Sequence, residues 1–144
     1  MNQHTKCKRI IFTASLVNEY GRDLPDIMSQ TLSYNAATGT HTMMLSSHGN
    51  LIQAIEGDPV HVNEAWRRVS NDARYFNQTK LEETWVSEPS FEGTHAGMHN
   101  YVLLSDVEFP HPVKSLPMVA DELNRRIRAS AIRQRLTQFA MDFA

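Results

Sequence analysis

The spacing of hydrophobic and polar positions along the chain predicts alternating strands and helices. Runs rich in β-branched residues predict strands, and apolar residues that recur every three or four positions predict amphipathic helices. The predicted order is strand, helix, strand, strand, helix, strand, with one further strand after it. The predicted strands cover 9–14, 40–46, 51–55, 79–86 and 96–104, and the predicted helices begin at residues 23 and 59.

Residues that begin or end elements support these boundaries. Gly39 is suited to end the first helix. Asp58 is a good N-cap for the second helix, and Pro59 suits its first position. A tight turn at 47–50 predicts a hairpin between the strands on either side of it. The order is the split β-α-β pattern of an α+β ferredoxin-like sandwich, in which an antiparallel sheet carries two helices on one face.

The C-terminal part of the chain follows a different pattern. After a ferredoxin-like domain over 1–105, prolines predict a stiff linker over 106–117, and 118–144 predicts a C-terminal helix or helix pair. The apolar stripe of this helix slips in phase before Ile132, which favours packing on two surfaces, the back of the sheet and a partner subunit. Its dense arginines are compatible with phosphate contacts, but a solvated face is the favoured interpretation.

Composition narrows the class of protein. The chain has 144 residues, a formal net charge of −2 and one cysteine. This fits one cytoplasmic domain without a disulfide and argues against a nucleic-acid partner. The polar N-terminus lacks the apolar segment of a signal peptide, and no run reaches the roughly 20 apolar residues of a membrane span. We expect no membrane partner.

Gln53 is a polar side chain within an apolar strand, and it is the most informative residue of the sequence. A buried amide without a partner costs roughly 1–3 kcal/mol. Gln53 therefore needs either a partner in the core or a ligand.

Other candidate chemistry is weak. His95 and His99 are four apart, but in a strand such residues lie about 13 Å apart, so no metal site is expected. Cys7 lies among basic residues that are expected to lower its pKa, yet no histidine and aspartate pattern supports a nucleophile. His41 is expected to be packed or exposed rather than to act as a base. We expect no enzymatic activity and no Gly-rich phosphate loop.

The stretch from Asn35 to Gly57 resembles the BLUF family of blue-light sensors that use flavin. The helix-ending asparagine, the hairpin and the Gln-Ala-Ile-Glu-Gly strand end fall at the family's spacing without a gap. Asp72-Ala-Arg74 resembles the family's aspartate–arginine pair, with Tyr75 in place of the usual histidine.

The resemblance implies a noncovalent flavin, FAD or FMN, between the two helices and against the sheet. By position, Asn35 and Gln53 match the amides that bond the ring, Ile27 an apolar ring contact, and Arg74 a residue near the flavin tail. The remaining implied cofactor-binding residues are Thr13, at the tyrosine position of the first strand, and Met98, in the last strand.

The chain departs from the family pattern at three positions, one of which is Met98-His99-Asn100 in the last strand, where the family has Trp-x-Met. The family's Tyr-x-Ser corresponds to Thr13-Ala14-Ser15, and threonine cannot donate an electron to flavin. The family's small glycine beside the pocket corresponds to Thr42. The expected function is therefore a sensory or regulatory protein without a normal photocycle, which forms a homo-oligomer and signals by contact with an unknown downstream protein. The alternatives are a flavin-free interaction module and a flavoprotein without a light response.

Overall fold

The computed structural model describes residues 7–18, 22–47, 49–91, 93–98, 101–102 and 130–142 of the chain. The α+β ferredoxin-like fold and the C-terminal helix are confirmed. The predicted linker, and the predicted C-terminal helix before residue 130, lie outside the described residues. The elements in chain order are β1 (Cys7–Leu16), α1 (Leu24–Thr38), β2 (His41–Ser47), β3 (Asn50–Gly57), α2 (Pro59–Ser70), β4 (Tyr75–Val86), β5 (Thr94–Met98), β6 (Tyr101–Val102) and α4 (Ser130–Asp142).

The strands form one sheet with the order β4-β1-β3-β2-β5-β6. β1 lies between β3 and β4 and is antiparallel to both. The predicted hairpin of β2 and β3 is confirmed. β5 runs parallel to β2, so the sheet is mixed rather than wholly antiparallel. The single strand predicted at 96–104 is divided into β5 and the short, antiparallel β6.

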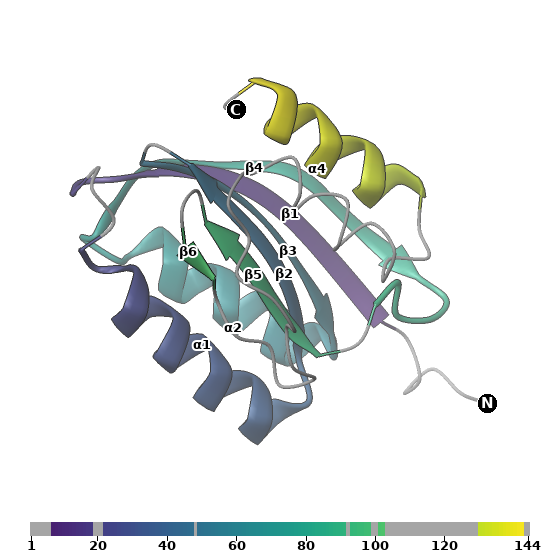
Figure 1. Cartoon of the computed structure of the whole chain (residues 1–144). Coiled ribbons are helices and arrows are strands. Elements are labelled where there is room, and N and C mark those ends of the chain that lie inside the picture. The colour runs from purple at the N-terminus through teal and green to yellow at the C-terminus, as the bar shows by residue number, and fades with distance from the viewer. Residues whose placement is uncertain are drawn as a thin grey trace.

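Helices cover both faces of the sheet (Figure 1): α1 and α2 lie on one face and α4 on the other. Because strand side chains alternate between faces, β1 contributes to both layers. Ile10, Phe12 and Ala14 belong to the core beneath α1 and α2. The intervening residues of β1 point to the face covered by α4, which buries Ile132 and Leu136.

Local interactions set the ends of the helices that cover the first face. Gly39 has a left-handed φ of 74° and donates its N–H to the carbonyl of Asn35 at 2.8 Å, which ends α1. The Asp58 carboxylate accepts the Val60 N–H at 2.9 Å and caps α2. These ends place Asn35 in the last turn of α1, directly before the chain enters β2.

A buried ionic cluster lies on the α4 face of the sheet. Arg9 donates to Glu82 from Nε at 2.9 Å and to Glu56 at 3.3 Å, and Glu56 is completely buried. Glu56 also accepts the Ser90 N–H at 2.6 Å. Glu82 lies 3.5 Å from Nε of Arg135 in α4. The cluster therefore connects three strands, the loop before β5 and the C-terminal helix.

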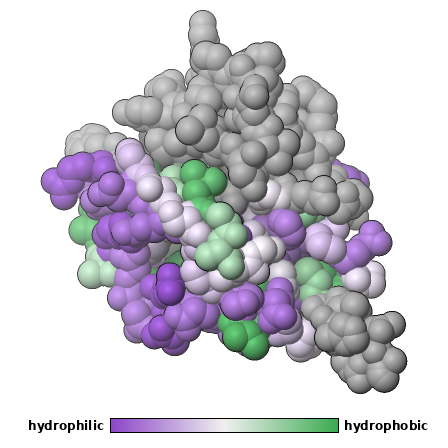
Figure 2. All heavy atoms as spheres, turned by 90° about the horizontal axis from the view of Figure 1, so that it is seen from below, coloured by the Kyte–Doolittle hydropathy of each residue, from purple (hydrophilic) through white to green (hydrophobic). Residues whose placement is uncertain are grey.

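Figure 2 shows the molecule from the side of α1 and α2, where the described surface is mainly hydrophilic and hydrophobic residues form small separate groups. The apolar sides of these two helices are used in the core. In the part of the chain that the structure describes, no helix is long and apolar enough to span a membrane.

Candidate functional site

A cavity of about 110 Å³ lies between α1 and α2, against the middle of the sheet. We call it the slot. α1, α2, the central strands β2 and β3, and the segment that leads into β4 all contribute to its wall. The lining residues are Ile27, Gln30, Thr31, Tyr34, Asn35, Thr42, Gln53, Ile55, Ala65, Arg68, Val69, Asp72, Arg74 and Tyr75.

Gln53 lies in the slot wall on the central strand β3. Its side chain is only 6% exposed, and no hydrogen bond of its amide is found among the described residues. A buried amide in this state carries a desolvation cost of about 1–3 kcal/mol. The slot is large enough for water, which needs about 10–15 Å³, so either water or a ligand can satisfy Gln53.

Asn35, the second amide in the slot wall, is already bonded. It is 7% exposed, and its Nδ2 donates to the Thr42 hydroxyl at 2.9 Å. Thr42 stands where the family resemblance placed a glycine. The threonine therefore adds a hydroxyl that fixes the orientation of the Asn35 amide inside the slot.

Three contacts connect the two walls of the slot. The Tyr34 hydroxyl of α1 donates to the His61 carbonyl of α2 at 2.7 Å. The Arg68 guanidinium lies 4.7 Å from the centre of the Tyr34 ring, a cation–π distance. The Arg74 guanidinium donates to the side chain of Gln30 in α1 at 2.8 Å. The first two contacts join α1 to α2, and the third joins α1 to the segment between α2 and β4.

The segment after α2 carries an ion pair and a buried phenol. Arg74 donates to both carboxylate oxygens of Asp72, and this hydrogen bonding holds the pKa of Asp72 below its usual range. Tyr75 is buried, and loss of solvation raises the pKa of its hydroxyl. No hydrogen bond of that hydroxyl is found among the described residues, so the slot contains a second buried polar group without a protein partner there.

Four of the six cofactor-binding residues expected from the sequence meet in this slot. Asn35, Gln53, Ile27 and Arg74 all line it. Met98 lies in β5, and its side chain is outside what the structure describes.

Thr13, expected among the cofactor-binding residues, does not line the slot. Thr13 pairs with Ile52, and both line a separate cavity on the α4 face. Phe12 is the residue that pairs with Gln53 and lies on the slot face. Neighbouring residues of a strand point to opposite faces of the sheet, so Thr13 and Phe12 lie on different faces.

Several lining residues were not predicted. Gln30, Thr31 and Tyr34 lie three, four and seven residues after Ile27, so all four share one face of α1. That spacing was visible in the sequence and could have identified them once Ile27 was chosen. Tyr75 was noted in the sequence as standing in place of the family's histidine, but its spacing did not show that it lines the slot, because that depends on how β4 enters the sheet.

The other candidate residues that the structure describes are buried or packed against neighbours. Cys7 is buried at the start of β1, and burial together with Glu56 raises the pKa of its thiol, so the expected lowering is wrong. His41 accepts the Gly93 N–H at Nδ1 at 2.8 Å and packs against Phe91, as expected of a packed residue. His99 lies outside the described residues.

The sequence matches the family model described as "BLUF: Sensors of blue-light using FAD" over residues 8–97. The match includes every element from β1 to β4 and most of β5. No curated protein matches the sequence.

Solved BLUF structures have the same fold. The dark state of BlrB, a BLUF protein, is 16% identical with a TM-score of 0.61, over 67% of this chain and 75% of that chain. The photo-activated state of BlsA is 19% identical with a TM-score of 0.59, over 65% and 71%. Klebsiella pneumoniae BlrP1 with FMN and cyclic diGMP is 16% identical with a TM-score of 0.71, over 94% of this chain but only 35% of that chain.

Proposed function

Because the chain belongs to the BLUF family of sensors of blue light using FAD, we propose that it binds a flavin, FAD or FMN, in the slot between α1 and α2. We further propose that it does so without the normal photocycle of the family. In a BLUF protein the bound flavin supplies the absorption of blue light and accepts an electron when excited.

The observation that carries this proposal is the buried amide of Gln53. It faces the slot without a hydrogen-bond partner among the described residues. A flat heterocycle with ring nitrogens and carbonyl oxygens offers both acceptors and donors to such an amide. Binding would therefore remove a cost that the fold otherwise carries.

The remaining residues of the slot fit the same group. Asn35, oriented by Thr42, supplies a second amide at the end of α1. Ile27 and Val69 contribute apolar surface from the two helices. Arg74 supplies a cation at the side of the slot, where a phosphate of the flavin tail would be favoured.

The absence of a normal photocycle rests on Phe12. This residue pairs with Gln53 on the slot face of β1, and we propose that its position corresponds to the family's electron-donating tyrosine. Phenylalanine has no hydroxyl to give up a proton. Tyr34 and Tyr75 are phenols in the slot wall, but neither lies on β1 beside Gln53.

A flavin-free interaction module is the second candidate, and the narrow slot favours it. About 110 Å³ is well below the roughly 300–1,000 Å³ of typical ligand pockets. A ring could enter only if α1 and α2 moved apart, which would break the Tyr34–His61 hydrogen bond. In this alternative the closed slot is a permanent part of the core.

Absorption spectroscopy of the purified protein separates the two candidates. A flavin absorption band in the blue, together with FAD or FMN released on denaturation, supports the first candidate. A colourless protein that stays colourless after incubation with FAD and with FMN supports the second. Tyr34→Phe removes the hydrogen bond between the helices and should speed flavin uptake in the first case only. Tyr20→Phe, outside the described residues, serves as a tyrosine control.

We also propose that the output of the protein is a change in contact with another protein or with a second copy of this chain. α4 packs on the back of the sheet and connects to β4 through Arg135 and Glu82, so a change in strand position would reach its surface. Light scattering of the purified chain, with and without flavin, measures the oligomeric state. A monomer in every state would contradict the homo-oligomer.

A further inference from the structure

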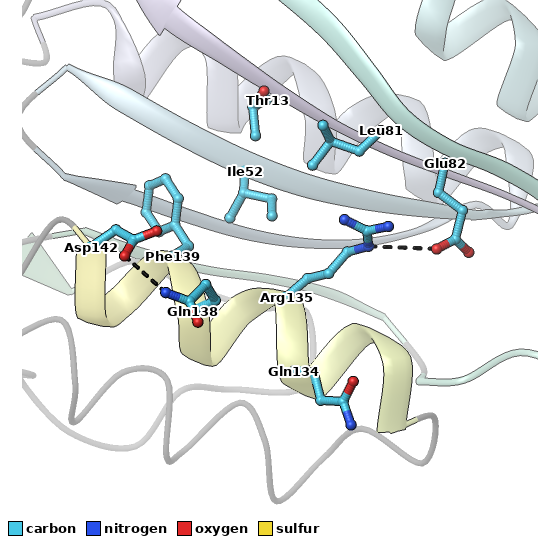
Figure 3. A pocket seen from close by; sticks show the side chains of 9 residues that line it. All are labelled: Thr13, Ile52, Leu81, Glu82, Gln134, Arg135, Gln138, Phe139 and Asp142. Carbon is cyan, nitrogen blue, oxygen red and sulfur yellow. Dashed lines mark hydrogen bonds and ion pairs between the residues drawn. The ribbon is translucent and has the colours of Figure 1, made fainter.

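A second and larger cavity, of about 530 Å³, lies between α4 and the opposite face of the sheet (Figure 3). We call it the α4 cavity. Its volume falls within the roughly 300–1,000 Å³ of small-molecule sites. The lining residues are Thr13, Ile52, Leu81, Glu82, Gln134, Arg135, Gln138, Phe139 and Asp142.

The α4 cavity has an apolar wall. In Figure 3, Ile52 and Leu81 extend from the sheet toward α4, and the Phe139 ring rises from the helix to meet them. Ile52 and Phe139 are buried, while Leu81 is 40% exposed and lies at the side open to solvent. This wall suits the hydrocarbon or aromatic body of a small molecule.

The two ends of the α4 cavity carry different polar groups. Asp142 accepts a hydrogen bond from Gln138 at 2.8 Å at one end, so these two groups partly satisfy each other. Arg135 lies at the other end and uses Nε for its contact with Glu82. Its two terminal nitrogens have no hydrogen-bond partner among the described residues, and Figure 3 shows them directed toward the sheet.

Arg135 offers hydrogen-bond donors rather than an excess of positive charge at its end of the α4 cavity. Glu82 is shared between Arg135 and Arg9, and Arg9 also pairs with Glu56. Two guanidinium groups and two carboxylates therefore balance before a ligand binds. A guanidinium with two adjacent free N–H groups matches a carboxylate in a bidentate arrangement. Asp142 repels a carboxylate from the opposite end, which fixes the orientation of the ligand.

We propose that the α4 cavity is a binding site for a small organic acid with an apolar body. Its carboxylate binds the terminal nitrogens of Arg135, and its apolar body lies against Ile52, Leu81 and Phe139. The site is separate from the slot and does not require flavin. It is bounded by the neighbours of the slot residues, because Thr13 and Ile52 adjoin Phe12 and Gln53 along the same strands.

Titration of the full chain with phenylacetate and octanoate, each compared with its uncharged amide, tests this site. Isothermal calorimetry and saturation-transfer NMR measure the binding. We expect at least one acid to bind about tenfold or more tightly than its amide, since a charge-assisted bidentate pair is roughly twice as strong as a neutral one. No binding of either acid, or equal binding of acid and amide, would overturn the proposal.

Two variants locate the binding. Arg135→Gln should weaken acid binding about tenfold or more, whereas the matched variant Arg133→Gln, on the same helix but outside the cavity lining, should not. Leu81→Trp should fill the open side of the cavity and weaken binding of the acid. If Arg135→Gln and Arg133→Gln bind the acid equally, the assignment of the site is wrong. The flavin content of each variant is measured separately, so acid binding at the α4 cavity can be judged even if the protein binds no flavin in the slot.

Discussion

Phe12 lies directly opposite Gln53 across the antiparallel pair of β1 and β3. Both residues face α1 and α2, and the Phe12 ring also packs against Trp66 of α2, with ring centres 5.2 Å apart. A completely buried phenyl ring therefore adjoins a buried amide that has no partner among the described residues. Substitutions of Phe12 or Gln53 should therefore change which polar groups lie in or next to the slot.

Phe12→Tyr should introduce a hydroxyl beside Gln53. We expect the flavin-loaded variant to gain a reversible red shift of the flavin band under blue light, measured by absorption spectroscopy. The hydroxyl and the Gln53 amide can satisfy each other, so the variant should lose little stability.

Thr13→Tyr is the matched control for this substitution. It places the same phenol one residue along β1, in the α4 cavity rather than the slot. A light-induced shift in Thr13→Tyr but not in Phe12→Tyr would show that the strand register assigned to β1 is wrong.

Gln53→Leu should stabilise the flavin-free protein. The substitution removes a buried amide that lacks a partner and replaces it with an apolar side chain of similar size, so we expect the free energy of unfolding to rise by about 1 kcal/mol. Asn35→Leu should have the opposite sign, because it removes the hydrogen bond to Thr42. Urea unfolding measures both, and a loss of stability in Gln53→Leu would mean that the amide is well satisfied in the flavin-free state.

Glu56→Ala should strongly destabilise the fold. Glu56 is completely buried and bonds both Arg9 and the Ser90 backbone, so its loss leaves a buried guanidinium less compensated. Removal of one partner from a buried ion pair typically costs about 3–5 kcal/mol. Glu64→Ala is a suitable control, because Glu64 pairs with Arg67 and Arg68 on the exposed side of α2. If chemical denaturation shows that Glu56→Ala and Glu64→Ala lower the free energy of unfolding equally, the burial of Glu56 does not add to the cost.

The Asp72–Arg74 pair should make stability depend on acid pH. Hydrogen bonding to Arg74 holds the pKa of Asp72 below its unfolded value, so this contribution is present above that value, about 3.9. It is lost as the pH falls through the lower pKa of the folded state. Asp72→Asn should reduce the fall in unfolding free energy between about pH 5 and pH 2, and Asp26→Asn, on the exposed side of α1, should not. Parallel curves for wild type and Asp72→Asn would contradict this assignment.

Most of the fold was predictable because it is specified locally. Helical spacing, the glycine after α1 and the Asp-Pro start of α2 marked those elements, and the structure has Gly39 and Asp58 in these roles. The division of the last strand into β5 and β6, and the parallel pairing of β5 with β2, were not predicted. Those features depend on contacts between distant segments, which local spacing does not encode.

The slot was predicted in part for the same reason. Gln53 was identified because a polar residue in an apolar strand conflicts with its surroundings, and Asn35 because it lies at the end of a helix. Thr13 was expected among the flavin-binding residues but lines the α4 cavity, because the spacing of a three-residue motif does not fix which face a strand residue occupies. The contacts of Tyr34 with α2 depend on the distance between two helices, which no pattern along one helix reveals.

The sheet separates the slot from the α4 cavity by a single layer of backbone, and the adjacent residues Ile52 and Gln53 of β3 line different cavities. Because alternate residues of β3 face different cavities, a substitution that changes the side chains of one cavity leaves those of the other unchanged. Substitutions that alter the slot would therefore leave the side chains that line the α4 cavity unchanged.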